Sequence, residues 1–209
     1  MKLIRIKGRA VGAAFLLVSL ALFATAPWSV AAEPGQAVAM AGDEVPKGKQ
    51  TTLGLYVTAA QAYEMWRAAP DTTKVIDVRT PEEYVFVGHA EMAWNIPLAF
   101  ASYEMKDGKL KPQPKKNAAF VNLVREIAQP TDTLLVMCRS GGRGAKAVDL
   151  LAAAGFTKVY NIVDGMEGDT VDDPQSVYFG KRMKNGWKNS APWVYTLDVE
   201  KVILEEGAY

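Results

Sequence analysis

The sequence predicts an α/β fold in which a central parallel sheet is covered by helices on both faces. Short apolar runs rich in β-branched residues alternate along the chain with segments whose apolar side chains recur at helical spacing. The connections between most of these segments are short, and no internal repeat is present. Strands that alternate with helices in this way are typical of a parallel sheet between two helical layers.

The strands are expected at the most apolar of these runs, over residues 55–57, 74–78, 133–137 and 159–163. Each run is at most five residues long, which suits a buried strand better than a helix. The run at 133–137 is the most apolar of the four. We therefore expect it in the middle of the sheet, where a strand is buried on both faces.

Helices are expected over residues 59–69, from residue 81 onward, over 117–128 and over 144–154. Thr58 and Asn117 are suitable N-caps for the first and third of them. The segment Thr80-Pro-Glu-Glu83 has the form of a capping box with proline at the first helical position. Gly155 suits the left-handed cap that ends the last helix.

The N-terminus has the pattern of a secretory signal peptide. Lys2, Arg5, Lys7 and Arg9 precede an uncharged apolar stretch, and Val30-Ala-Ala32 offers the small residues that a signal peptidase recognises. We expect residues 1–32 to be a signal peptide that is cleaved after Ala32, and the protein to be exported to the periplasm. The apolar stretch is shorter than the ~20 residues of a spanning helix, and an uncleaved anchor remains the alternative.

The rest of the chain is expected to form one domain. Residues 33–52 are predicted to be a flexible leader, residues 53–195 the folded domain, and residues 196–209 a C-terminal tail. Loss of residues 1–32 would remove four of the 24 basic residues and none of the 23 acidic ones, which leaves a net charge of 20 − 23 = −3. This charge argues against a nucleic-acid partner, and no later segment has the length and apolarity of a membrane span.

Cys138 is the only cysteine, and it lies where the most apolar strand ends. The residues after it, Arg139-Ser-Gly-Gly-Arg143, lead directly into a predicted helix. Backbone N–H groups at a helix N-terminus stabilise an anion, so a thiol in this place tends to ionise. Ligands of open α/β sheets also bind beyond the carboxyl ends of the strands. Cys138 is therefore the candidate nucleophile of an active site.

Four ordered motifs resemble the rhodanese domain of sulfurtransferases. They are Val75-Ile-Asp-Val-Arg79, Pro81-Glu-Glu-Tyr84, Gly88-His-Ala90 leading to Asn95-Ile-Pro97, and Cys138-Arg-Ser-Gly-Gly-Arg143. The resemblance extends over residues 53–194. The chain departs from the family pattern after His89, where Ala-Glu-Met-Ala-Trp94 replaces the usual Ile, spacer and Gly-Ala, a change expected to affect packing more than chemistry.

This resemblance implies a rhodanese-like fold and sulfur transfer through a Cys138 persulfide, with no other cofactor. The sulfur donor would be thiosulfate or a similar small anion, and the acceptor a thiol, cyanide or a protein. The substrate-binding residues would then be Arg139, Ser140, Gly141, Gly142, Arg143 and Gly144. Glycine at 141 and 142 lets the backbone approach the sulfur, and the arginines offer planar donors to an oxyanion. Arg143 has a structural alternative, an ion pair with Asp77 or Glu83.

The length of the loop favours sulfur transfer over phosphate chemistry. Cys138 and Arg143 enclose four residues, whereas related phosphatases enclose five, and the smaller loop fits a single sulfur atom. A phosphatase or arsenate reductase is thus the less favoured alternative. A further alternative is a non-catalytic sulfur-binding or scaffolding domain, because a fold does not guarantee turnover.

His89 is the only histidine, so no histidine-based metal cluster exists and no metal site is expected. Its position about fifty residues before Cys138 is also that of the caspase histidine, but Val136-Met137 precedes the cysteine in place of Gln-Ala. We therefore interpret His89 as structural. Asp77, Arg79 and Glu83 are expected to support the site in the same way, through hydrogen bonds at the strand end and the helix cap.

Two segments are left over from the regular pattern. Residues 101–116 are rich in lysine and predict a solvated excursion, with docking of an acidic partner as the alternative. Residues 169–184 are an insertion in an acidic context whose spacing fails the EF-hand pattern for calcium. Because this insertion follows the strand beside Cys138, we expect it to border the entrance and to help select the donor or acceptor.

Overall fold

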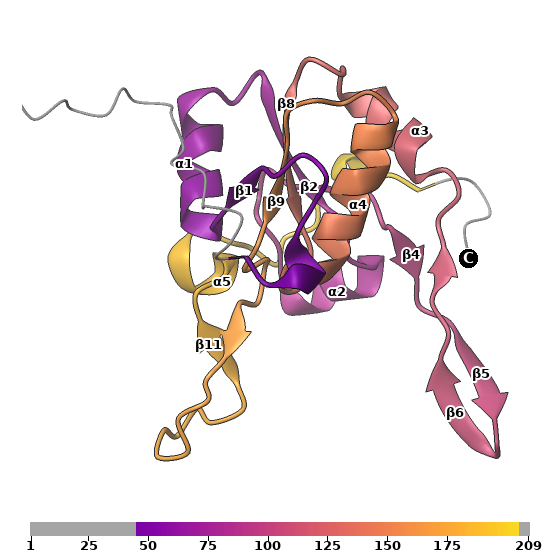
Figure 1. Ribbon diagram of the computed structural model, residues 1–209, viewed down its shortest axis with the longest axis vertical. Helices are drawn as coiled ribbons and strands as arrows, with labels where there is room; N and C mark the ends of the chain where they lie inside the picture. The colour runs from indigo at the N-terminus through magenta and orange to yellow at the C-terminus, as the bar shows by residue number, and fades with distance from the viewer. Residues whose placement is uncertain (1–44, 205–209) are drawn as a thin grey trace, which may run out of the picture. The chain divides into compact units, whose positions relative to one another are not determined.

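A computed structural model describes residues 45–204 of the chain (Figure 1). Its centre is a sheet of five parallel strands in the order β1-β9-β8-β2-β3. Their bounds are Tyr56–Val57 for β1, Thr73–Asp77 for β2, Trp94–Asn95 for β3, Thr133–Met137 for β8 and Val159–Ile162 for β9. The predicted parallel α/β sheet is confirmed, and β8 is its central strand as expected.

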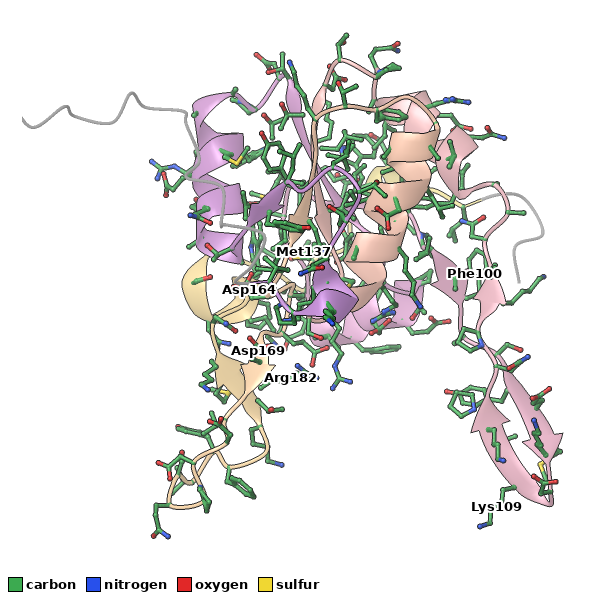
Figure 2. All side chains as sticks on the ribbon, in the orientation of Figure 1. Phe100, Lys109, Met137, Asp164, Asp169 and Arg182 are labelled. Atoms are coloured by element: carbon green, nitrogen blue, oxygen red, sulfur yellow. The ribbon has the colours of Figure 1, made fainter. Side chains whose placement is uncertain are left out.

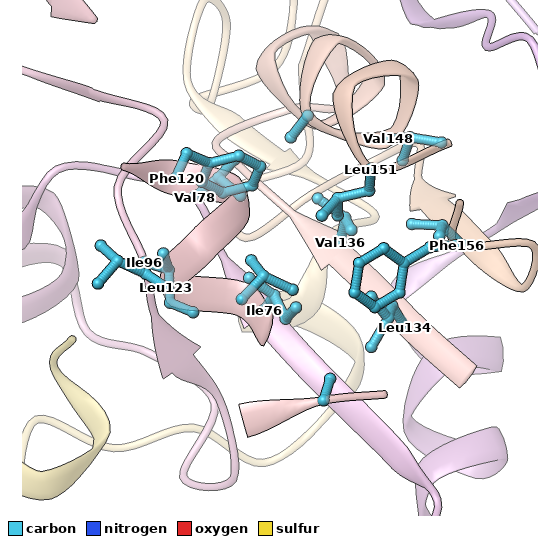
Figure 3. Packing of buried hydrophobic residues seen from close by; sticks show 14 of the residues in the cluster. Ile76, Val78, Ile96, Phe120, Leu123, Leu134, Val136, Val148, Leu151 and Phe156 are labelled. Carbon is cyan, nitrogen blue, oxygen red and sulfur yellow. The ribbon is translucent and has the colours of Figure 1, made fainter. Parts of the chain in front are cut away.

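Helices cover both faces of this sheet (Figure 1). Side chains alternate along β8, so that Leu134 and Val136 face one layer while Leu135 and Met137 face the other. The first layer contains α3 (Phe120–Ile127) and α4 (Gly142–Ala153), and its packing is seen in Figure 3. The second layer contains α1 (Ala59–Ala68), α2 (Pro81–Val87) and α5 (Trp187–Ser190).

The helix caps follow the sequence at most positions. Thr58 accepts a hydrogen bond from the Gln61 N–H, and Thr80 and Glu83 form the predicted capping box. Gly155 has φ of +95°, as expected for a left-handed cap. Asn117 is the exception, because α3 begins only at Phe120. Its side chain instead bridges the Pro97 carbonyl and the Ala119 N–H, which makes it a turn residue before the helix.

The lysine-rich excursion is ordered as a hairpin, which we call the β5–β6 arm. Strands β5 (Tyr103–Lys106) and β6 (Lys109–Pro112) pair antiparallel around Asp107-Gly108, both of which have positive φ. At its base, β4 (Ala99–Phe100) pairs with β7 (Lys115–Lys116). Figure 2 shows Lys109 at the tip, far from the sheet, and Phe100 at the base.

The insertion forms a second projection, the β10–β11 arm. Its base is the antiparallel pair β10 (Asp169–Thr170) and β11 (Arg182–Lys184). Both arms leave the domain at the end of the sheet where α4 begins (Figure 1). This is the end formed by the carboxyl ends of the parallel strands, where sheets of this class bind their ligands.

The folded part is longer at both ends than the predicted range of 53–195. Val45 is buried against Tyr56 and Val163, and residues 45–52, which include the short helix η2 (Lys47–Lys49), lie against α4. We call residues 45–52 the strap. After the helical turn η3 (Val199–Lys201), Ile203 donates its N–H to the Asn95 carbonyl at the sheet edge.

The other terminal predictions cannot be compared with the structure. The signal peptide, residues 33–44 of the leader and residues 205–209 of the tail lie outside the described residues. Within residues 45–204, none of the helices combines the length and the apolarity that a bilayer crossing requires.

Candidate active site

Cys138 lies directly after the central strand β8, at the start of a tight loop that leads into α4. Its Sγ accepts a hydrogen bond from the Gly141 N–H at 3.2 Å. The residue is 2% exposed, and its carbonyl accepts the Met166 N–H at 2.7 Å, which fixes the loop from behind. The Sγ atom thus lies against the backbone of the loop that leads into α4.

The three loop glycines have different roles. Gly141 has φ of +96°, and a Cβ there would lie 2.4 Å from the Val163 carbonyl oxygen, so only glycine fits. Gly144 faces the side chain of Asn161, whose Oδ1 would lie 2.5 Å from its Cβ. A Cβ on Gly142 would make only an ordinary contact at 3.7 Å. The sequence predicted that glycine is needed at positions 141 and 142. The structure requires it at 141 and at 144 instead of 142. In both places the reason is close packing against β9 or the turn that follows it.

Arg143 forms an ion pair with Glu83 of α2, one of the two pairings expected from the sequence. Its Nη1 and Nη2 each donate to a different carboxylate oxygen at 2.6 Å. Burial alone would raise the pKa of Glu83, but the hydrogen bonds and charge of Arg143 outweigh it and lower that pKa. The same pairing raises the pKa of Arg143. In this structure the guanidinium therefore faces a carboxylate of the protein.

Arg139 lies at the surface and is paired more loosely. Its Nε lies 3.2 Å from Glu167 Oε1, and about half of its side chain is exposed. Exposed pairs of this kind contribute ~0–1 kcal/mol, so little holds Arg139 in place. Ser140 is half-buried. Contact of Arg139, Ser140 or Arg143 with a substrate stays a prediction.

Asp77 and Arg79 form a fully buried ion pair at the carboxyl end of β2. Arg79 donates to both oxygens of Asp77 and also to the Gly88 carbonyl. Asn95 donates to the carbonyls of both residues, which joins β2 to β3. Every polar group of the pair is satisfied within the protein, and its structural role stays a prediction.

His89 contacts aromatic and backbone groups. It stacks on Tyr84 with ring centroids 3.7 Å apart, and its Nδ1 hydrogen-bonds with the Tyr84 carbonyl oxygen. Burial lowers its pKa, and its backbone pairs with Val194. The structural role of His89 stays a prediction, with which these contacts agree.

Asn161 on β9 is a site residue that sequence reasoning missed. Its Nδ2 donates to the Gly141 carbonyl at 3.1 Å and to the Lys49 carbonyl at 2.9 Å, so one side chain ties the reactive loop to the strap. The signal was present, because an asparagine interrupts the apolar run Val159-Tyr-Asn-Ile162. A polar residue in a buried strand needs hydrogen-bond partners.

The turn after β9 links the reactive loop to the β10–β11 arm. Asp164 accepts the N–H groups of Ala59 and Gly186 at 2.8 Å each, and burial raises its pKa. Farther along, Asp169 pairs with Lys49 of the strap at 3.2 Å. Figure 2 shows Asp164, Asp169 and Arg182 in succession from the sheet into this arm. The base of the insertion thus adjoins the loop that holds Cys138.

The acidic residues of the insertion do not gather around a common point. Asp172 pairs with Lys184 at 3.1 Å, while Asp169 faces Lys49. Over residues 45–204, no three acidic, histidine or cysteine side chains come together as potential metal ligands. The part of the chain that the structure describes therefore offers nothing in favour of a calcium site.

Comparison with known proteins agrees with this geometry. The family model described as rhodanese-like domain matches residues 58–170. Thiosulfate sulfurtransferase 16, chloroplastic, of Arabidopsis thaliana is 40% identical over 92 residues, which cover 44% of this chain and 69% of that protein. Thiosulfate sulfurtransferase 18 of the same plant is 39% identical over 93 residues, covering 43% and 61%.

A solved structure extends the similarity to the fold. The crystal structure of Rv0390 from M. tuberculosis is 28% identical in sequence and superposes with a TM-score of 0.51. The superposition covers 67% of this chain and 96% of that one. The family match spans more than half of the chain and includes Cys138 with its loop. The chain therefore belongs to the rhodanese-like domain family.

Proposed function

We propose that this protein is a sulfurtransferase that carries a sulfane sulfur on Cys138. The observation that supports this most is the Gly141 N–H that donates to Sγ, in a loop that opens the N-terminus of α4. A persulfide formed there would have its outer sulfur within reach of the same backbone groups. The names of two curated relatives, thiosulfate sulfurtransferases, agree with this chemistry.

The reaction consists of two displacements at sulfur. In the first, the Cys138 thiolate attacks the outer sulfur of thiosulfate, the S–S bond of the donor breaks, and sulfite leaves with the electron pair. In the second, an acceptor thiolate or cyanide attacks the outer sulfur of the persulfide and Cys138 leaves as the thiolate. No net oxidant is needed, and the chain has no second cysteine to divert the persulfide into an internal disulfide.

Two arginines near the reactive loop are the groups that we expect to bind an anionic donor, in competition with their partners Glu83 and Glu167. The side chain of Arg143 is about one third exposed. Arg139, half exposed, offers a second cation at the mouth of the loop. Sulfite is released as a dianion or monoanion, so the same cations stabilise it as it forms. We further propose that the protein works after export, as its N-terminus predicts.

Intact-mass spectrometry tests this function. The protein is incubated with thiosulfate, its mass is measured, and cyanide is then added while thiocyanate is assayed. We expect a gain of one sulfur atom that cyanide removes, and no gain for Cys138→Ser.

Two other results would each reject the proposal. If the protein forms no sulfur adduct with thiosulfate, polysulfide or an organic persulfide, the domain is a scaffold. Turnover of p-nitrophenyl phosphate or arsenate that depends on Cys138, without a sulfur adduct, would indicate the phosphatase or reductase alternative.

A further inference from the structure

A second concave site lies beside the reactive loop, and of its lining residues only Arg143 has a role in the proposed sulfur transfer. It is a cavity of about 840 Å³ between α3, α4 and the base of the β5–β6 arm. Arg143 lines this cavity and also the neighbouring one of about 670 Å³ that Glu83 lines. The larger cavity therefore adjoins the first turn of α4, while Cys138 is not among its lining residues.

The walls of the larger cavity are mostly apolar. Among the lining residues, Val121 of α3 is partly exposed and Leu150 of α4 is exposed, whereas Phe120 is 1% exposed. Leu150 is 47% exposed, although the two helices otherwise bury their apolar residues against the sheet. Exposed apolar side chains in a concave site, as opposed to scattered single residues, indicate a binding surface.

The polar groups around this apolar surface are mainly cationic. Lys116 and Lys146 line the cavity, both are exposed, and neither forms an ion pair with another described residue. Asp149, the carboxylate among the lining residues, accepts the N–H and the hydroxyl of Thr52 through Oδ1 and keeps its charge, but three cationic side chains in the lining outnumber it. An anion entering this site would find two free ammonium groups close to an apolar surface.

We propose that this cavity binds an organic anion with an apolar body. The charged group lies against Lys116 and Lys146, and the apolar part covers the surface around Leu150. Small inorganic anions such as thiosulfate have no apolar part and bind at the reactive loop instead. The proposal is independent of the persulfide chemistry, since none of the residues that carry it takes part in sulfur transfer.

Isothermal titration calorimetry of the full chain with octanoate tests the proposal, with acetate and 1-octanol as the probes that lack the tail or the charge. We expect octanoate to bind more tightly than either, and hexanoate to bind less tightly than octanoate, since each buried methylene is worth about fourfold in affinity. Amide NMR shifts should change at residues 116–121 and 143–150. Cys138→Ser should bind octanoate unchanged even if it forms no persulfide.

Matched variants locate the site. Lys146→Glu should weaken octanoate binding about fivefold, and Leu150→Asp about tenfold, without a change in melting temperature or in persulfide formation. The controls are Lys158→Glu and Leu197→Asp, which alter residues of similar exposure outside the cavity and should have no effect.

Three results would overturn the assignment. The first is absence of octanoate binding. The second is binding that Lys146→Glu and Leu150→Asp leave intact, or NMR shifts confined to other parts of the domain. The third is a self-association, detected by sedimentation velocity and abolished by Leu150→Asp, which would assign the apolar surface to a second copy of the chain.

Discussion

Glu83 hydrogen-bonds both with Arg143 and with the backbone of its own helix cap. Its Oε2 accepts the Thr80 N–H at 3.1 Å and Arg143 Nη1 at 2.6 Å. The carboxylate that closes the capping box of α2 therefore also holds the first turn of α4, which follows Cys138. The side chain of Glu83 thus connects the N-terminus of α2 to the loop that follows Cys138.

Replacing this carboxylate should cost stability. Glu83→Gln retains a capping acceptor but loses the charged pair with Arg143, so we expect the free energy of unfolding at pH 7 to fall by ~1–2 kcal/mol. The lower part of this range is favoured because both side chains are about a third exposed and screened by water. Urea unfolding measures the difference. Glu82→Gln, at an exposed neighbouring position, is the control and should change it little.

The same pair predicts a dependence on pH. The pKa of Glu83 is lower in the folded protein than in the unfolded chain, so its contribution is fully present above the ordinary glutamate pKa of ~4.3. It is lost as the pH falls through the folded value. The stability gap between wild type and Glu83→Gln should therefore be constant from pH 7 to about 5.5 and narrow below about 4.5. A gap that widened on acidification would contradict the pairing.

The loop glycines should differ in their tolerance of alanine. Gly144→Ala places a methyl group against the side chain of Asn161, and Gly141→Ala adds backbone strain as well. We expect each to lower the free energy of unfolding by ~1–3 kcal/mol and to slow persulfide formation. Gly142→Ala, with only an ordinary contact, should be close to wild type. Equal effects at 142 and 144 would show that the close approach to Asn161 is unimportant.

The buried ion pair of Asp77 and Arg79 should be sensitive to removal of one charge. Asp77→Asn leaves the Arg79 guanidinium buried without its carboxylate, for which we expect a loss of ~3–5 kcal/mol in unfolding free energy. Asp71→Asn, at an exposed position, is the matched control. Denaturant unfolding compares the two. A loss below about 1 kcal/mol for Asp77→Asn would mean that the pair is not isolated from water.

Shortening the β10–β11 arm tests its expected role at the entrance. Replacing residues 171–181 with Asn-Gly keeps Asp169 and its pairing with Lys49. Persulfide formation from thiosulfate should change less than about twofold, because the loop is intact, whereas transfer to glutathione should change more than about fivefold in kcat/KM. Cyanide, a small acceptor, is the control. Unchanged rates with all acceptors would remove this arm from acceptor selection.

The sequence was most informative where short-range signals coincide. The caps at Thr58 and Thr80, the left-handed Gly155 and the apolar strand before Cys138 all predicted their structures correctly, because each depends on a few adjacent residues. The β5–β6 arm could also have been predicted. Asp107-Gly108 between short alternating segments is a strong hairpin signal, but the surrounding lysines favoured an irregular segment.

Contacts between distant parts of the chain were not predictable in the same way. The link from Asn161 to Gly141 and Lys49 needs three segments to meet, and the strap has a composition typical of a mobile leader. The parallel pairing of β1 with β9, together with the contacts of Lys49 and Thr52, holds that segment at the reactive loop. The pairing of Arg143 with Glu83 was one of two alternatives, and tertiary geometry alone decides between them.

The strand order also determines when the reactive loop can be completed during folding. β1 pairs with β9 and with no other strand of the central sheet, although about a hundred residues separate them. Non-local parallel pairing of this kind forms slowly. Because synthesis starts at the N-terminus, β1 has no pairing partner until β9 has been synthesised. We therefore expect the strap and Asn161 to close around Cys138 late in folding, and chains that lack β9 to leave the reactive loop unassembled.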